Sequence, residues 1–230
     1  MFCGEVMPNK QLNIWRQYLP DVTYANLYGP TEITDACTYY IVDRAFSDEE
    51  SLPIGIPMKN TDILVLNDRD ELVTGDETGE LCVRGTSLAM GYYNNLEKTK
   101  EAFVQNPLNK VVPETIYRTG DLVKYNKHGE IIYLSRKDFQ IKHMGHRIEL
   151  GEIETAVSSL EEISSCCCLY DEKRQKIVLF IDADLTKEYI KEKMEKLLPE
   201  YMMPSRTVYL QELPINANGK IDRVKLKEML

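Results

Sequence analysis

Residues 166–182 read CCCLYDEKRQKIVLFID, two apolar runs on either side of the charged segment DEKRQ. This pattern predicts two strands joined by a charged turn. Apolar residues at helical spacing over 151–160 predict a helix before this pair, and a charged amphipathic helix is expected over 186–198, with Thr186 as its N-cap. The further strands expected in this part are 139–143, 147–150 and 208–210. The order is therefore β-α-β-β-α-β, a split βαβ unit.

The preceding part of the chain is expected to be mostly antiparallel β-structure. From about residue 54 to residue 133, short apolar runs alternate with turns rich in Gly, Asn and Asp. The strands expected here are 61–66, 79–84, 122–125 and 131–134, preceded by a helix at 10–18 and strands at 22–27 and 38–42. We therefore predict an α+β protein in two domains, with a small antiparallel β-barrel or sheet ending residues 1–137 and the βαββαβ mini-domain occupying residues 138–230.

The composition excludes several classes of protein. Hydrophobic residues make up 43% and charged residues 28% of the 230-residue chain, which is typical of a globular protein. A net charge of −9 argues against a general nucleic-acid binder. The sequence has no apolar run of about eighteen residues, the length that predicts a membrane span, and no signal peptide is visible after Met1. A cytoplasmic protein without a membrane partner is expected.

Three of the six cysteines, Cys166, Cys167 and Cys168, are adjacent. Neighbouring residues of a strand point to opposite faces, so these thiols are expected to be reduced and to pack inside the sheet. A metal site would have to combine them with His143 and His146, but the chain has no CxxC pair to support it. Strand packing is the preferred interpretation.

Residues 26–32, NLYGPTE, carry chemistry that packing alone does not require. The ring of Tyr28 beside a Gly-Pro turn offers a flat face for a base. Thr31 adds a hydroxyl for a phosphate oxygen, and Glu32 adds a hard carboxylate that suits Mg²⁺. Taken alone, this segment is better explained as an ordinary turn capped by Thr and Glu.

Three later segments place polar residues on turns. Asp121 ends the segment YRTGD, and a carboxylate held beside a tight Gly turn can accept two hydrogen bonds from a vicinal diol. Arg136, in a basic stretch, can reach a ribose or phosphate oxygen. Lys220 follows Asn218-Gly219 and is expected to be exposed on a tight turn. Without further context, each of these is simply a solvated polar residue or strand.

Together with GELCVRG and the residues that follow it at 79–94, these segments resemble those of the ATP-dependent adenylate-forming enzymes in order, spacing and residue identity. Among them they are most similar to the amino-acid adenylation domains of nonribosomal peptide synthetases and to the D-alanyl carrier protein ligases. The resemblance covers nearly the whole chain, but only the later part of such an enzyme. It implies the end of a large AMP-binding domain over residues 1–137 and a small mobile domain over residues 138–230.

The resemblance assigns a role to individual residues. It implies that Tyr28 stacks on adenine and Asn26 contacts it, while Asp121 holds both ribose hydroxyls. Arg136 would contact a ribose or phosphate oxygen. Thr31 would contact a phosphate oxygen, and Glu32 would contact Mg²⁺. Lys220 would be the main catalytic residue, bridging the substrate carboxylate and the α-phosphate. The segment at 79–94 is expected to be structural, with no part in catalysis.

The remaining implied positions concern movement and the substrates. Asp138 matches the hinge about which the small domain rotates between two half-reactions, and the loop containing Gly145 would line the approach of the thiol. Asp35 and Ala36 match positions that border the amino-acid pocket. In an apolar pocket, Asp35 would favour a cationic or hydrogen-bonding side chain. The family usually has Gly where this chain has Ser135, which weakens the turn argument there.

The implied function is activation of an amino acid by ATP and Mg²⁺, followed by transfer to the phosphopantetheine thiol of a carrier protein. Relatives also have a phosphate loop ending in Lys, which this sequence lacks. We therefore expect a longer parent enzyme and an isolated chain that is inactive. Two alternatives stay open: an acyl-CoA ligase of the same superfamily, and a non-catalytic remnant that binds nucleotide or docks a carrier. D-alanine also stays open as the substrate.

Overall fold

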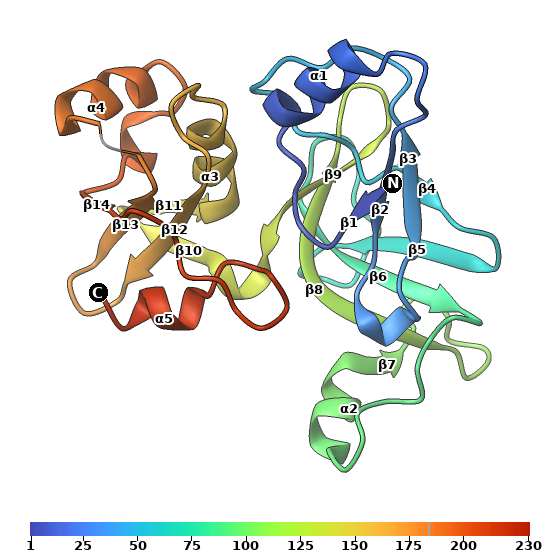
Figure 1. Ribbon diagram of the computed structural model, residues 1–230. Coiled ribbons are helices and arrows are strands. Elements are labelled where there is room, and N and C mark those ends of the chain that lie inside the picture. Colours follow the sequence, from blue (N-terminus) through green and yellow to red (C-terminus); the bar gives the residue numbers. More distant parts are fainter. Residues whose placement is uncertain (184) are drawn as a thin grey trace. The chain divides into compact units, whose positions relative to one another are not determined.

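The computed structural model describes residues 1–183 and 185–230, and the chain divides into two compact units (Figure 1). The first unit contains Met1–Met7 and Gln11–Lys137, and the second contains Pro8–Lys10 and Asp138–Leu230. After the short segment Pro8–Lys10, the chain passes from the first unit to the second between Lys137 and Asp138. Among the described residues, no helix combines the length and apolar character needed to span a bilayer.

The first unit opens with a four-stranded sheet in the order β1-β2-β3-β4. Its elements are β1 (Phe2–Cys3), α1 (Asn9–Tyr18), β2 (Ala25–Tyr28), β3 (Thr38–Ile41) and β4 (Ile56–Pro57). β1 and β2 are parallel, whereas the other pairs are antiparallel. Leu12 of α1 packs with Tyr40, Val42, Phe46 and Leu52 in a buried cluster, which holds the helix against the sheet. β2 and β3 frame the loop on which the site described below depends.

The second sheet of this unit is the curled antiparallel half-barrel that corresponds to the predicted barrel or sheet. It contains β5 (Thr61–Leu66), β6 (Gly79–Gly85), β7 (Phe103–Gln105), β8 (Thr115–Tyr125) and β9 (Ile131–Arg136). β8 pairs with β6 on one edge, and with β7 and then β9 on the other. Register shifts between Glu80 and Cys82 and between Leu122 and Val123 add local twist, which curls the sheet.

Where β6 pairs with β8, buried side chains pack on both faces of the half-barrel. Leu81 and Val83 belong to one buried cluster, while Cys82 lies with Leu66 and Ile116 in another. This alternation follows the two-residue period of a strand. The short helix α2 (Leu96–Ala102) and β7 were not predicted, because the apolar run at 103–105 is too brief to signal a strand.

The second unit has a hairpin followed by a three-stranded sheet with helices. Its elements are β10 (Gln140–His143), β11 (His146–Glu149), α3 (Leu150–Ser158), β12 (Cys166–Asp171), β13 (Lys176–Ile181), α4 (Lys187–Glu195), β14 (Arg206–Tyr209) and α5 (Arg223–Lys227). β12 and β13 are antiparallel, and β13 and β14 are parallel. The predicted α+β class holds, but the first strand of the expected βαββαβ unit is a hairpin with a sheet of its own. α5 was missed because five residues are too few for a helical period.

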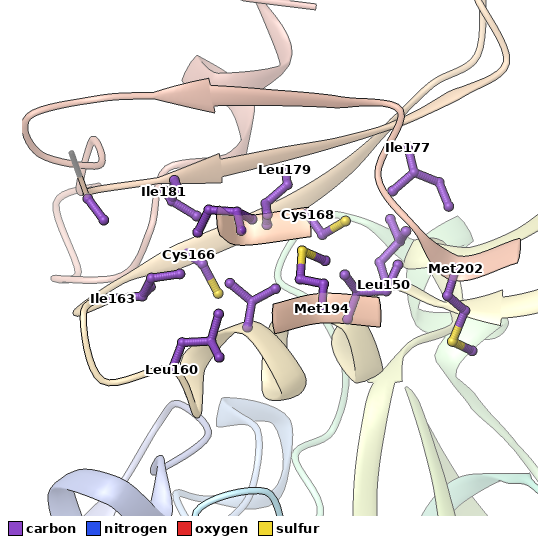
Figure 2. Packing of buried hydrophobic residues seen from close by; sticks show 14 of the residues in the cluster. Leu150, Leu160, Ile163, Cys166, Cys168, Ile177, Leu179, Ile181, Met194 and Met202 are labelled. Atoms are coloured by element: carbon purple, nitrogen blue, oxygen red, sulfur yellow. The ribbon is translucent and has the colours of Figure 1, made fainter. Parts of the chain in front are cut away.

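The adjacent cysteines pack on both faces of this sheet. Cys166 and Cys168 lie in one buried cluster with Leu179 and Met194, whereas Cys167 lies in the other. Figure 2 shows the first cluster, in which these side chains gather between the sheet and the helices. The thiols are free, and burial raises the pKa of Cys166 to about 12. They therefore pack as small apolar residues, as the strand interpretation requires.

Candidate functional site

The loop between β2 and β3 is closed tightly at its base. The backbone N–H of Cys37 donates to the carbonyl of Tyr28 at 2.8 Å. A Cβ placed on Gly29 would lie 2.6 Å from Cα of Ala36, so only glycine permits this approach. Ile33 and Cys37 are fully buried in the core of the unit. The loop is therefore fixed to the half-barrel from both ends and from its middle.

Three of the predicted nucleotide-binding side chains meet beside this loop. The register of β8 and β9 pairs Asp121 with Arg136, and Arg136 Nη1 lies 3.2 Å from Asp121 Oδ1. The Tyr28 hydroxyl donates to Asp121 Oδ2. Arg136 also donates to the carbonyl of Thr119 at 2.6 Å, which fixes its guanidinium. Strands distant in sequence thus bring a ring, a carboxylate and a cation together.

Burial dominates the electrostatics of this cluster. Desolvation raises the pKa of Asp121 above its ordinary value, although the Tyr28 hydrogen bond and the Arg136 charge oppose it. The pKa of Tyr28 is also raised, first by burial and then by the Asp121 charge. Tyr28 therefore stays a neutral donor at physiological pH, and Asp121 is a carboxylate with little water around it.

Asp121 lies within a strand rather than on the predicted tight turn. Gly120 before it has φ +71°, and a Cβ there would lie 3.0 Å from Arg136 Nη2. The glycine therefore makes room for the guanidinium as well as bending β8. A left-handed glycine in a strand looks the same in sequence as one in a turn, which explains the wrong prediction. Glu80, buried on β6, accepts from the Gly120 N–H at 3.1 Å and supports this bend.

Glu32 is held by two tyrosines. The Tyr92 hydroxyl donates to Glu32 Oε1 at 2.6 Å and lies 3.4 Å from the Tyr117 hydroxyl. The Glu32 carbonyl accepts from the N–H of Ala89 at 2.8 Å. Burial raises the pKa of Glu32, but the hydrogen bonds from Tyr92, its own backbone and Tyr117 outweigh it, so the pKa is lowered overall. Glu32 is a half-buried carboxylate, oriented and ionised.

Sequence reasoning did not identify Tyr92 and Glu80 as parts of this site. Both lie in the segment at 79–94, which was interpreted as purely structural. The available signals were Gly79-Glu80 and Gly91-Tyr92, where a polar or hydroxyl-bearing residue follows a glycine. Nothing in the sequence indicates that Tyr92 reaches Glu32 in the β2–β3 loop or that Glu80 reaches Gly120.

The other residues predicted near this cluster differ in exposure. Asn26 is buried on β2, and its Nδ2 donates to the Pro53 carbonyl at 2.8 Å. Thr31 is exposed in the 3₁₀ turn Thr31–Ile33. Asp35 is also exposed, with φ +85°, and Ala36 is half-buried. Within the described residues Asp35 is solvent-exposed, and its place beside an apolar amino-acid pocket stays a prediction.

Lys220 lies in the second unit, on a turn built by Asn216. The Asn216 Oδ1 atom accepts from the N–H groups of Asn218 at 2.9 Å and Lys220 at 3.1 Å. Gly219 has φ +76° with open space around it, and its N–H donates to the Asn216 carbonyl at 3.0 Å. Ile215 and Ile221 pair across the base. Lys220 is exposed, as predicted, on a hydrogen-bonded turn.

Two further predicted positions lie in the second unit. Met144 and Gly145 form the two-residue connection of the β10–β11 hairpin, with φ values of +50° and +83°. These values are typical of a type I′ turn, which explains the glycine. Asp138 is exposed in the 3₁₀ turn Lys137–Phe139, at the boundary between the units.

The donor set around Glu32 suits a hard cation that is brought by its substrate. Within residues 1–183 and 185–230, no group of three or more His, Cys, Asp or Glu side chains could hold a metal ion. Mg²⁺ is commonly bound by one or two carboxylates together with substrate phosphates and water. A single ionised Glu32 beside an exposed Thr31 hydroxyl fits that arrangement.

The sequence matches two protein-family models. Residues 1–93 match the family described as AMP-binding enzyme, and residues 152–220 match the AMP-binding enzyme C-terminal domain. The first match contains Tyr28 and Glu32 and the second ends at Lys220, whereas Asp121 and Arg136 lie between the two matched ranges.

Relatives are found among curated proteins and solved structures. Tyrocidine synthase 3 of Brevibacillus parabrevis is 39% identical over 98% of this chain and 4% of the synthase. The D-alanine–D-alanyl carrier protein ligase of Bacillus licheniformis is 35% identical over 99% of this chain. The structure of a four-domain nonribosomal peptide synthetase bound to AMP and glycine is 32% identical, with a TM-score of 0.79 over 96% of this chain and 17% of that one. The chain spans 47% of the ligase and far less of the synthetases.

Proposed function

This chain is the C-terminal portion of an AMP-binding adenylation domain, related to the adenylation domains of nonribosomal peptide synthetases and to D-alanyl carrier protein ligases, and we propose that its enzyme activates an amino acid with ATP and passes it to a carrier-protein thiol. The family uses ATP. The choice of amino acid, the carrier and Mg²⁺ are parts of the proposal.

The observation that carries this proposal is the meeting of Tyr28, Asp121 and Arg136. A ribose diol supplies two O–H donors, and Asp121 has two carboxylate oxygens to accept them. The aromatic ring of Tyr28 offers a stacking face for adenine, and Asn26 beside it on β2 would contact the base. Arg136 would reach the ribose or a phosphate oxygen. A nucleoside monophosphate is the ligand that best matches these groups.

Thr31 and Glu32 would act at the phosphates. The exposed Thr31 hydroxyl would donate to a phosphate oxygen, while Glu32, oriented by Tyr92, would hold Mg²⁺. The metal would neutralise charge on the phosphates when bound. The Tyr92 hydrogen bond lowers the pKa of Glu32 and orients its carboxylate, so Tyr92 would contribute to the metal site without touching the nucleotide.

Lys220 would be the catalytic residue of the first step. A carboxylate oxygen of the amino acid attacks the α-phosphorus of ATP, and pyrophosphate leaves with the electrons of the broken P–O bond. The lysine ammonium would stabilise the negative charge that develops on the α-phosphate and bridge it to the attacking carboxylate. The Asn216 turn would hold this side chain outward, where a substrate can meet it.

The second step would use the same small domain in another orientation. The carrier's thiolate attacks the carbonyl carbon of the aminoacyl adenylate, and AMP leaves as the thioester forms. Asp138, exposed at the boundary between the units, would be the hinge for this change. The turn at Gly145 would line the approach of the thiol. Asp35 and Ala36 would border the amino-acid pocket.

Pyrophosphate exchange with the complete enzyme, run across a panel of amino acids that includes D-alanine, tests the proposal. Exchange that depends on one or a few amino acids is expected, as is loss of exchange in Lys220→Ala. Transfer from a supplied aminoacyl adenylate to the carrier should survive that substitution. AMP release that requires coenzyme A and no carrier would instead identify an acyl-CoA ligase. AMP binding without turnover on any acid would refute the enzymatic proposal.

A further inference from the structure

Arg223 joins several separate parts of the second unit. Its Nη2 atom lies 2.7 Å from Glu154 Oε2 on α3, and its Nη1 donates to the carbonyl of Cys168 on β12 at 3.2 Å. Its guanidinium carbon lies 4.7 Å from the centre of the Phe139 ring. Arg223 itself is the first residue of α5. One side chain therefore links two helices, a strand and the residue that follows Asp138.

The acceptor in this arrangement is itself fixed. Glu154 Oε1 accepts from the backbone N–H of Cys168 at 2.6 Å, so the carboxylate cannot turn away from Arg223. The side chains of Arg223 and Glu154 are 27% and 19% exposed. This pair therefore differs from solvated surface ion pairs, which contribute little to stability. Burial opposes the charge of Arg223, but Glu154 outweighs it, and the pKa of Arg223 lies above its ordinary value. The guanidinium remains charged and held by its planar face and edge.

Arg223 follows the Lys220 turn directly. The N–H of Asp222 donates to the Pro214 carbonyl at 2.7 Å, which closes the base of the segment 214–222. Asp222 also caps α5 by accepting from the N–H of Lys225 at 3.1 Å. The base of the turn is therefore continuous with the backbone that Arg223 anchors.

We propose that Arg223 is a positioning residue for Lys220. Through Glu154 and Phe139 it fastens the base of the 214–222 segment to the residues after Asp138. Lys220 would therefore move together with the hinge segment. This inference rests on the proposed role of Lys220 in adenylate formation. A group displaced by about 1 Å can lose on the order of a hundredfold in rate, so the anchoring has a kinetic consequence.

Hydrogen exchange in the complete enzyme tests the anchoring without reference to activity. Arg223→Met and Glu154→Gln should both speed exchange of the backbone amides of Asn216, Gly219 and Asp222, which are hydrogen-bonded in the turn. Arg206→Met, which removes an exposed arginine from β14, is the matched control and should leave exchange in this segment unchanged. Unchanged exchange in both test variants would overturn the proposal. Glu154→Gln provides the reading if Arg223→Met does not fold.

Kinetics then separates positioning from a merely structural role. In pyrophosphate exchange, kcat should fall about 10- to 100-fold in Arg223→Met while KM for ATP stays unchanged. Arg223→Lys, which keeps the charge but not the fork, should recover only part of the rate. Equal loss in transfer from supplied adenylate, or an unchanged kcat, would overturn the inference. If Lys220→Ala itself retains exchange, the proposed function fails first, so the two failures are distinguishable.

Discussion

Asp121 and Arg136 are partners across strands β8 and β9, and their side chains meet at 3.2 Å. The second oxygen of the same carboxylate accepts the Tyr28 hydroxyl. Each oxygen of the carboxylate therefore already accepts one hydrogen bond from the protein and keeps a second lone pair. A ribose diol that binds here would use the remaining lone pairs of a carboxylate that the protein already orients.

The first prediction concerns nucleotide affinity. Asp121→Asn should weaken AMP binding about 10- to 100-fold, since hydrogen bonds to a charged acceptor contribute about 1.5–3 kcal/mol. Calorimetric titration of AMP measures this change. Asp76→Asn, at an exposed position in the turn before β6, is the control and should bind AMP as the unsubstituted protein does. Equal affinities for all three proteins would show that Asp121 does not contact the ligand.

The second prediction concerns pH. Because burial raises the pKa of Asp121, the carboxylate gains its proton at a higher pH than an exposed aspartate does as the solution is acidified. Affinity for adenosine, which has no phosphate to titrate, should therefore fall as the pH decreases through this raised pKa. Asp121→Asn should remove this part of the dependence. The same pH profile in both proteins would contradict the assignment.

The third prediction concerns Tyr92. Its hydrogen bond lowers the pKa of Glu32, so Tyr92→Phe should raise that pKa. A lowered carboxylate pKa stabilises the fold above the unfolded-state value, and this stability is lost as the pH falls through the folded-state pKa. The variant should thus be less stable at neutral pH, by about 1 kcal/mol, with the difference shrinking in acid. Denaturant unfolding at several pH values measures it.

Tyr93 supplies the control for that experiment. It is adjacent to Tyr92 but fully exposed, so Tyr93→Phe removes the same hydroxyl without touching Glu32. The carbon-13 chemical shift of the Glu32 carboxyl reports its titration. The midpoint of that titration should differ from the midpoint in the unsubstituted protein only in the Tyr92 variant. If the two variants give the same titration curve, Tyr92 does not set the charge of Glu32.

The sequence predicts local structure here better than it predicts contacts between distant residues. Local patterns predicted the strands at 61–66 and 166–182, the glycine turns and the exposed Lys220, because each depends on a few neighbouring residues. The contacts of Tyr92 with Glu32 and of Glu80 with Gly120 join positions 60 and 40 residues apart. Side-chain meetings of this kind depend on the curl of the half-barrel, and the bulges that produce the curl have no specific sequence signal.

The final prediction uses two turns in which an Asn side chain accepts from the same pair of backbone N–H groups. At residues 126–130, as at 216–220, an Asn side-chain oxygen accepts from the N–H groups two and four residues later, and a glycine donates to the Asn carbonyl. Asn216→Ala should therefore cost about 1 kcal/mol of stability, and Asn126→Ala should cost at least as much, because it also removes the hydrogen bond from Asn126 Nδ2 to Glu130 Oε2. Only Asn216→Ala should also lower kcat of pyrophosphate exchange, about tenfold, because that turn presents Lys220. Equal losses of kcat in the two variants would mean that these turns affect activity only through the stability of the fold. An unchanged kcat in both variants would show that the Asn216 turn has no part in catalysis.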